Sequence, residues 1–117
     1  MVRKTQEEFP WHYRVVRASD YRSIYGTGQK VHGERFVLYG RRNNLGHSRL
    51  GMTVSRRVGK AVVRNRIKRL LREIFRKSAD HIPNHFDFVV NAKRGSATAD
   101  YPALCAEFLA AVRKLVQ

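Results

Sequence analysis

The segment from Ser55 to Lys77 constrains the fold of this chain more than any other part of its sequence. On a helical wheel, one arc collects six large apolar side chains, those of Val63, Ile67, Leu70, Leu71, Ile74 and Phe75. The rest of the surface is basic, because ten lysines and arginines and one acid, Glu73, lie between Arg56 and Lys77. A helix of this kind packs its apolar stripe on a sheet and leaves its cations in solvent.

The charge of this helix predicts a bound polyanion. Like charges four residues apart, such as Arg64 and Lys68, destabilise an isolated helix. A helix face that meets only solvent ordinarily mixes charges of both signs. A nearly acid-free stretch of this length therefore favours a surface that binds an anionic partner over a solvated face.

The excess charge of the whole chain is concentrated around the same segment. The 117 residues carry a formal charge of +15, and residues 30–77 hold 15 basic residues against Glu34 and Glu73. Arginine outnumbers lysine 17 to 7, and guanidinium groups bind phosphate in bidentate fashion and stack on bases. Genome composition can raise the share of arginine, but it cannot explain the clustering. We therefore expect an RNA partner rather than a membrane surface.

Composition also excludes or disfavours several classes of protein. No run approaches the length of a membrane span, about 18 apolar residues, and the N-terminus lacks the apolar stretch of a secretory signal. The one cysteine, Cys105, falls in an apolar helical pattern and is expected to be a reduced core thiol. We expect a cytoplasmic protein.

The remaining sequence predicts a single α+β domain behind an N-terminal arm. Residues 1–17 show no clear hydrophobic period, so we expect an extended or disordered arm there. Residues 18–117 then form one RNA-binding α/β sandwich domain. Its first helix begins at Ser19 and Asp20, which are typical capping residues, and the glycines at positions 26 and 28 end it early.

Strands and a final helix follow from side-chain alternation and turn residues. Residues 35–39 and 86–90 predict strands by their β-branched and aromatic content, with a turn over residues 40–46. Residues 48–55 alternate apolar and polar side chains, which predicts a half-buried antiparallel partner strand. Asp100 opens a last helix, whose apolar stripe consists of Leu104, Phe108, Ala111, Val112 and Leu115.

Three tyrosines are candidates for contact with single-stranded RNA. Tyr21 and Tyr25 lie one helical turn apart, and Tyr39 ends the neighbouring strand. Aromatic platforms in a basic groove hold single-stranded RNA, and each stacked base contributes roughly 1–3 kcal/mol. The residues alone leave open whether these tyrosines line such a groove or pack in the core with their hydroxyls at the surface. Thr53 and Ser55 lie on the polar face of their strand, where their hydroxyls can reach phosphate or ribose.

The sequence offers no recognisable constellation for cleaving RNA. None of its five histidines lies in a familiar catalytic context. Asp80, His81, His85 and Asp87 superficially resemble a metal cluster, but their segment has the composition of a loop. Paired carboxylates that could hold two magnesium ions are missing from the basic region. We predict no catalytic residue and no metal ligand.

The string from Arg49 to Glu73, with Arg64-Asn65-Arg66 at its centre, closely resembles the signature of the bacterial ribonuclease P protein component. The resemblance runs from about residue 14 to the last helix and includes Asp20-Tyr21, Ile24-Tyr25, Gly28 and residues 36–39. The family more often has phenylalanine at position 21, where tyrosine keeps the stacking face. The first 13 residues match nothing in the family pattern.

The resemblance implies a small protein subunit of a ribonucleoprotein that removes the 5′ leader from precursor tRNA. Its partners are then ribonuclease P RNA and precursor tRNA, and neither DNA nor a membrane is expected. The RNA subunit is the catalyst in this family, so we expect no cofactor on the protein alone and Mg²⁺ held by RNA phosphates. The implied fold is α-β-β-β-α-β-α with a left-handed β-α-β crossover, against the usual right-handed rule.

The resemblance also implies two binding surfaces. A cleft between the first helix and the sheet holds the single-stranded leader, through Tyr21, Tyr25, Tyr39, Thr53 and Ser55. The basic helix and its preceding loop bind the RNA subunit, through Arg56, Arg57, Lys60, Arg64, Asn65, Arg66, Lys68, Arg69 and Arg72.

Two other classes of protein stay open. A ribosomal or other structural RNA-binding protein also carries a basic helix on a small sheet, but it needs no aromatic leader groove. A DNA-binding regulator would place residues 60–77 in a major groove. A strand, rather than the first helix of a helix-turn-helix, precedes this segment, which disfavours that class.

Overall fold

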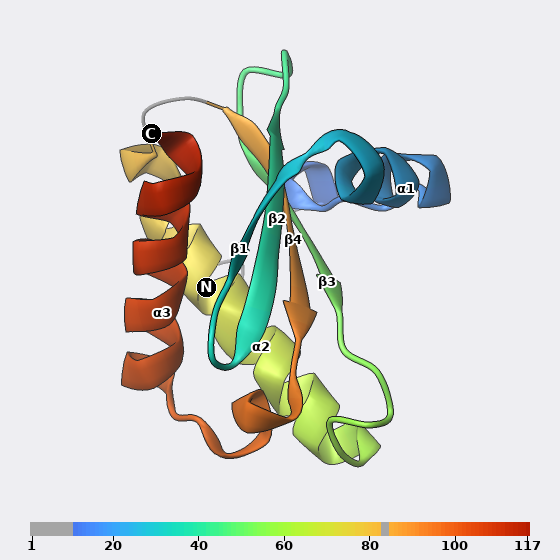
Figure 1. Cartoon of the computed structure of the whole chain (residues 1–117), viewed down its shortest axis with the longest axis vertical. Helices are drawn as coiled ribbons and strands as arrows, with labels where there is room; N and C mark the ends of the chain where they lie inside the picture. Colours follow the sequence, from blue (N-terminus) through green and yellow to red (C-terminus); the bar gives the residue numbers. More distant parts are fainter. Residues whose placement is uncertain (1–10, 83–84) are drawn as a thin grey trace, which may run out of the picture.

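The basic helix packs its apolar stripe on one face of a four-stranded sheet in the computed structural model, which describes residues 11–82 and 85–117. This helix is α2 (Ala61–Ser78), and α3 (Tyr101–Val116) lies beside it on the same face. The opposite face is covered in part by α1 (Ala18–Thr27) (Figure 1). Among the described residues, none of the helices is long and apolar enough to cross a membrane.

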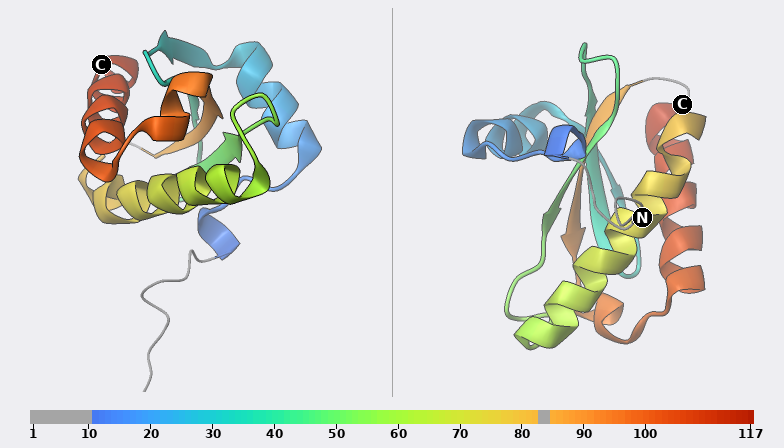
Figure 2. Two further views of the ribbon diagram at one scale, coloured as in Figure 1. Left: turned by 90° about the horizontal axis from the view of Figure 1, so that it is seen from below. Right: turned by 180° about the vertical axis from the view of Figure 1, so that it is seen from behind.

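The sheet joins antiparallel and parallel strands. Its strand order is β1-β2-β4-β3, with bounds β1 (Gln29–His32), β2 (Phe36–Arg42), β3 (Arg49–Thr53) and β4 (Phe86–Ala92). The pairs β1–β2 and β2–β4 are antiparallel, whereas β3 is parallel to β4. Seen from behind in Figure 2, α2 crosses in front of the sheet, and the path from β3 to β4 is left-handed. The implied element order and crossover are confirmed.

Alternation along the strands sends the large apolar side chains to the face that α2 and α3 cover. Phe36 and Leu38 of β2, Leu50 of β3, and Phe88 and Val90 of β4 are at most 2% exposed. The predicted stripe of α3 is buried in full. The opposite face carries the polar and aromatic side chains of the same strands around a smaller apolar cluster of Val15, Ile24 and Val89, against which Tyr21, Tyr25 and Tyr39 pack.

Four expectations about the elements are wrong in detail. The first helix begins at Ala18 with Arg17 as its N-cap, rather than at Ser19 and Asp20. The strand predicted over residues 48–55 is not an antiparallel partner of the preceding strand, because β4 lies between β2 and β3 and pairs with β3 in parallel. Alternation tells which face a side chain takes, but not which neighbour a strand joins. The turn predicted from Gly40 begins too early, since β2 continues to Arg42. Gly26 lies inside α1 rather than ending it.

The predicted arm, residues 1–17, falls partly outside the described residues. A short 3₁₀ helix, η2 (Trp11–Tyr13), precedes an isolated parallel β-bridge between Arg14 and Leu50. The Val15 amide donates to the Leu50 carbonyl at 3.1 Å, and Val15 is buried. The chain just before α1 therefore packs along the outer edge of β3, and the boundary between arm and domain stays a prediction.

Two glycines at the end of α1 provide a matched test of this packing. A Cβ at Gly28 would lie 2.5 Å from the Ile24 carbonyl oxygen and 2.7 Å from the Gly40 carbonyl oxygen, whereas a Cβ at Gly26 meets nothing within 4 Å. Gly28→Ala should lower the free energy of unfolding by about 1–3 kcal/mol. Gly26→Ala should raise it by about 0.5–1 kcal/mol, because alanine favours a helix. Urea unfolding measures both, and equal effects would contradict the close approach at Gly28.

Candidate RNA-binding surfaces

Tyrosines of α1 and β2 meet on the sheet face opposite α2 and α3. The Tyr25 hydroxyl and Thr53 Oγ1 share a hydrogen bond of 2.8 Å, and the Tyr25 and Tyr39 rings meet edge-on with centroids 4.6 Å apart. Lys30 Nζ lies over the Tyr39 ring, 6.0 Å from its centroid. We call Tyr25, Tyr39 and Thr53 the tyrosine cluster. All three side chains are half-buried, so they combine fixed positions with exposed surface.

The environment of Tyr25 keeps its phenol protonated at neutral pH. Burial raises the pKa of Tyr25, and the neighbouring phenols of Tyr39 and Tyr21 raise it further, while the hydrogen bond with Thr53 lowers it. The net shift of the pKa is upward. The hydroxyl can therefore both donate and accept hydrogen bonds at this surface.

Tyr21 packs beside the tyrosine cluster on the same apolar residues, Val15, Ile24 and Val89, whereas Ser55 lies apart from the rest of the predicted leader set. The Tyr21 hydroxyl accepts a hydrogen bond of 3.2 Å from the Met52 amide, so Tyr21 reaches the outer edge of β3. Ser55 is exposed beyond the end of β3, where its carbonyl accepts from the Val58 amide in a turn. Sequence reasoning missed Asn91, which is half-buried and in register with Thr53 on the same face.

The cationic surface consists of the loop before α2 and the helix side that faces away from the sheet. Its only acid, Glu73, pairs with Arg76 and Lys77 at 2.7 and 3.4 Å, so it neutralises only the last turns of α2. Lys60, the N-cap residue, makes no side-chain cap. Arg56, Arg57, Lys60, Asn65 and Arg69 are exposed, whereas Arg64, Arg66, Lys68 and Arg72 are half-buried.

Two arginines at the centre of the signature also hold the backbone. Arg64 Nε donates to the Gly59 carbonyl at 3.1 Å, which fixes the loop to the start of α2. Arg66 donates to the Ala99 carbonyl at 2.6 Å and so ties α2 to the segment before α3. These two side chains support the fold as well as contributing charge, a role that sequence reasoning missed.

A cavity of about 270 Å³ lies between α2 and the edge of β3, and we call it the edge cavity. Lys68, Arg72, Arg14 and Tyr21 are among its lining residues, and none of the lining residues is acidic. Arg72 Nε is buried and makes no hydrogen bond among the described residues. Burial, and then the charge of Arg14, lower the pKa of Arg72. A buried cationic donor beside further cations favours a bound anion.

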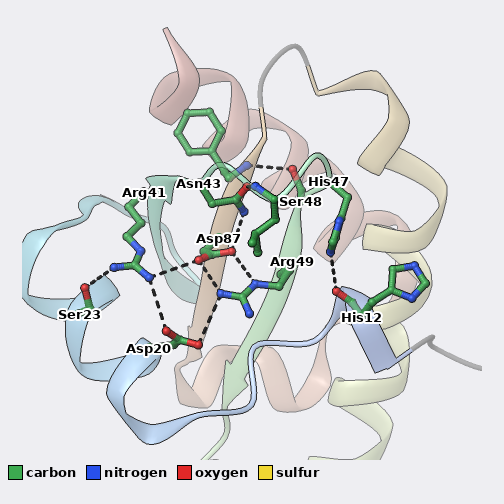
Figure 3. A network of polar contacts seen from close by, with 11 residues as sticks. His12, Asp20, Ser23, Arg41, Asn43, His47, Ser48, Arg49 and Asp87 are labelled. Carbon is green, nitrogen blue, oxygen red and sulfur yellow. Dashed lines mark hydrogen bonds and ion pairs between the residues drawn. The ribbon is translucent and has the colours of Figure 1, made fainter.

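On the sheet face that α1 covers, a buried carboxylate links α1 to the strands through arginines (Figure 3). Asp87 of β4 is 1% exposed and accepts two hydrogen bonds from Arg49, each of 2.8 Å. Asn43 donates a third at 2.7 Å. Asp20 of α1 lies 3.7 Å from Arg41 and 3.6 Å from Arg49. Residues of α1, β2, β3 and β4 thus share one network of ion pairs.

The arginines keep this buried carboxylate ionised. Burial by itself raises the pKa of Asp87, but hydrogen bonds from Arg49 and Asn43 and the charges of Arg49 and Arg41 outweigh it. The pKa of Asp87 therefore lies below its ordinary value. Sequence reasoning missed the ion pair of Arg49 and Asp87. Each of these charged residues lies in a largely apolar strand, a pattern that indicates a buried ion pair.

The sequence is similar to those of known ribonuclease P proteins. A family model described as Ribonuclease P matches residues 9–116. The ribonuclease P protein component of Desulfovibrio desulfuricans is 39% identical over 112 residues, which cover 92% of this chain and 86% of the relative. That of Thermotoga petrophila is 44% identical over 84 residues, 72% of each chain.

Solved structures of RNase P proteins have the same fold as this chain. The RNase P protein of Staphylococcus aureus superposes with a TM-score of 0.81 at 31% identity, over 90% of this chain and 98% of that chain. The RNase P protein of Thermotoga maritima superposes with a TM-score of 0.76 at 34% identity, over 88% and 94% of the two chains. Fold and sequence similarity therefore agree.

The ion-pair network predicts that the free energy of unfolding depends on the Asp87 carboxylate. Asp87→Asn should lower the free energy of unfolding by about 3–5 kcal/mol, because it leaves the largely buried Arg49 guanidinium without its partner. The carboxylate of the wild type stabilises the fold above the unfolded pKa of about 3.9, and this contribution is lost as the pH falls through the lower folded pKa.

Urea unfolding between about pH 3 and pH 7 measures this dependence. The part of the acid sensitivity due to Asp87 should be absent in Asp87→Asn. It should persist in the control Asp80→Asn, whose side chain is exposed in η3 (Ala79–His81). A pH dependence that is the same in Asp87→Asn and the wild type would refute the assignment.

Proposed function

Because the chain belongs to the bacterial ribonuclease P protein family, we propose that it is the protein subunit of the ribonucleoprotein that removes the 5′ leader from precursor tRNA. The cationic, nearly acid-free surface of α2 is the observation that carries this proposal. In it, the chain binds RNA and positions substrate, while the RNA subunit coordinates Mg²⁺ through its phosphates and breaks the bond.

The cationic surface of α2 is the proposed contact with the RNA subunit. Exposed guanidinium groups bind phosphate strongly when no carboxylate competes for them. Among the described residues, neither Arg57 nor Arg69 forms an ion pair, so both remain available to phosphates. The uncapped start of α2 adds backbone N–H groups and the positive end of the helix dipole.

The tyrosine cluster is the proposed contact with the single-stranded leader. The Tyr39 ring offers a stacking platform, and the Lys30 ammonium above it attracts the leader phosphates. The Tyr25 and Thr53 hydroxyls and the Asn91 amide add hydrogen-bonding groups on the same face. Such groups bind and orient a strand, and stacking on a ring accepts any base, so the leader sequence can vary.

The proposed binding of the RNA subunit predicts a change in salt dependence. Arg57→Gln combined with Arg69→Gln should weaken binding to a bacterial ribonuclease P RNA. It should also flatten the slope of log affinity against log salt by about one for each phosphate that the variant no longer neutralises. Arg113→Gln with Lys114→Gln removes the same charge from exposed positions on α3 and should leave the slope unchanged. Equal slopes for the two double variants would contradict the proposed surface.

The proposed leader site predicts an effect that only leader-bearing substrates reveal. Tyr39→Ala should lower the affinity of the assembled ribonucleoprotein for precursor tRNA by about fivefold to 150-fold, the equivalent of one stacked base. Tyr39→Phe keeps the ring and should retain most of the affinity. Binding of mature tRNA, which lacks the leader, should change in neither variant. A reduction of equal size for both RNAs would place Tyr39 outside the leader site.

A further inference from the structure

A larger cavity, outside both proposed surfaces, lies beside the network of Figure 3. Its walls come from the chain just before α1, from the start of α1 and from the loop between β2 and β3. Its volume is about 800 Å³, within the range of roughly 300–1,000 Å³ that small-molecule sites occupy. We call it the terminal cavity.

The terminal cavity carries more positive charge than its own acids neutralise. Five arginines and two aspartates line it. Both aspartates are engaged by Arg41 and Arg49 in the ion-pair network. Arg17 and Arg42 also line the cavity, are exposed, and form no ion pair among the described residues. These two guanidinium groups are therefore available to an anion such as phosphate.

The same cavity has apolar and aromatic walls. Val16 is 48% exposed and Leu45 is 50% exposed, and these are two of only four large hydrophobic side chains exposed among the described residues. The His12 and His47 rings lie edge to face with centroids 5.3 Å apart, and His47 Nε2 is 2.7 Å from the His12 carbonyl oxygen. Flat, unpaired nucleobases bind to surfaces of this composition.

We propose that the terminal cavity binds one unpaired nucleotide of RNA. Its base lies against Val16 and Leu45, and its phosphate is held by Arg17 and Arg42. A nucleotide contacts both the apolar and the cationic parts of the lining, whereas an inorganic anion contacts only the cationic part. An apolar peptide, in turn, contacts only the apolar part and leaves the arginines unpaired.

The position of the terminal cavity relative to α2 supports RNA as its ligand. Arg14 and Val16 line both the terminal cavity and the edge cavity. The edge cavity also contains Lys68 and Arg72 of α2. RNA on the cationic surface can therefore follow a basic path past the edge of β3 into the terminal cavity. The inference rests on the proposed function of α2 and adds a third RNA-binding site, whose nucleotide comes from either the RNA subunit or precursor tRNA.

Site-directed cross-linking tests this site and identifies the source of the nucleotide. Cys105→Ala removes the only cysteine of the chain, so Leu45→Cys can then carry a thiol-linked photo-cross-linker. Val62→Cys, at a site 74% exposed on α2, reports on the proposed RNA surface. Leu109→Cys, at a site 38% exposed on α3, reports background. Each protein is assembled with a bacterial ribonuclease P RNA, with and without precursor tRNA.

We expect position 45 to cross-link to an unpaired nucleotide and position 109 to give background only. A cross-link without precursor tRNA assigns the nucleotide to the RNA subunit, and one that needs precursor tRNA assigns it to the substrate. Cross-linking from position 62 but not from position 45 overturns this inference and leaves the proposed function intact. Background at both positions contradicts both proposals.

Measurements of RNA affinity distinguish the contribution of the cationic part of the lining from that of the apolar part. Arg17→Gln with Arg42→Gln should flatten the salt slope of RNA binding by about one, because the two cations that neutralise the bound phosphate are removed. Leu45→Asn should lower the affinity without changing the slope, because it removes an apolar surface and no charge. The charge-matched control is again Arg113→Gln with Lys114→Gln. Unchanged affinity in both cavity variants would overturn the inference.

Discussion

Burial of the apolar stripe of α2 against the sheet allows this helix to carry a charge that it could not carry alone. Ile67, Leu71, Ile74 and Phe75 are buried, and each such side chain contributes roughly 1.5–3 kcal/mol. Like-charge pairs along the helix cost only about 0.2–0.5 kcal/mol each. Packing therefore outweighs repulsion, and the outer side of α2 is left free to be almost entirely cationic.

The two faces of the sheet have separate tasks as a result. One face is filled by the core beneath α2 and α3, and the other face carries the polar groups of the strands around a smaller apolar cluster of Val15, Ile24 and Val89. There, the ion pairs of Asp87 and its arginines and the burial of Ile24 beside Val89 together fix α1, which in turn places Tyr25 against Tyr39 and Thr53. The ion-pair network and the tyrosine cluster are thus neighbours on one face, and both depend on the position of α1.

Local patterns in the sequence predict much of this arrangement, and long-range pairings account for the rest. The stripe of α2, the stripe of α3 and the cap of α3, where Asp100 accepts from the Ala103 amide, all follow from spacing within one helix. The pairing of β3 with β4 and the bond between Arg49 and Asp87 join residues far apart in the chain. The period of a strand does not encode such partners.

The candidate surfaces divide in the same way. The cations of α2 are visible in the sequence, but the hydrogen bond from Arg66 to the Ala99 carbonyl is not. The tyrosines are visible, but not that Tyr21 reaches the Met52 amide while Tyr25 meets Thr53. The left-handed crossover was expected only from the family resemblance, since the general rule for β-α-β units predicts the opposite hand.

Cleavage of precursor tRNA at low Mg²⁺ tests the central claim, that the chain binds RNA while its RNA partner cuts, most directly. The protein alone, a bacterial ribonuclease P RNA alone and the two combined are compared in one assay. We expect no cleavage by the protein stripped of RNA and faster cleavage by the mixture than by the RNA alone. Cleavage by the RNA-free protein, or a mixture no faster than the RNA alone, would contradict the claim.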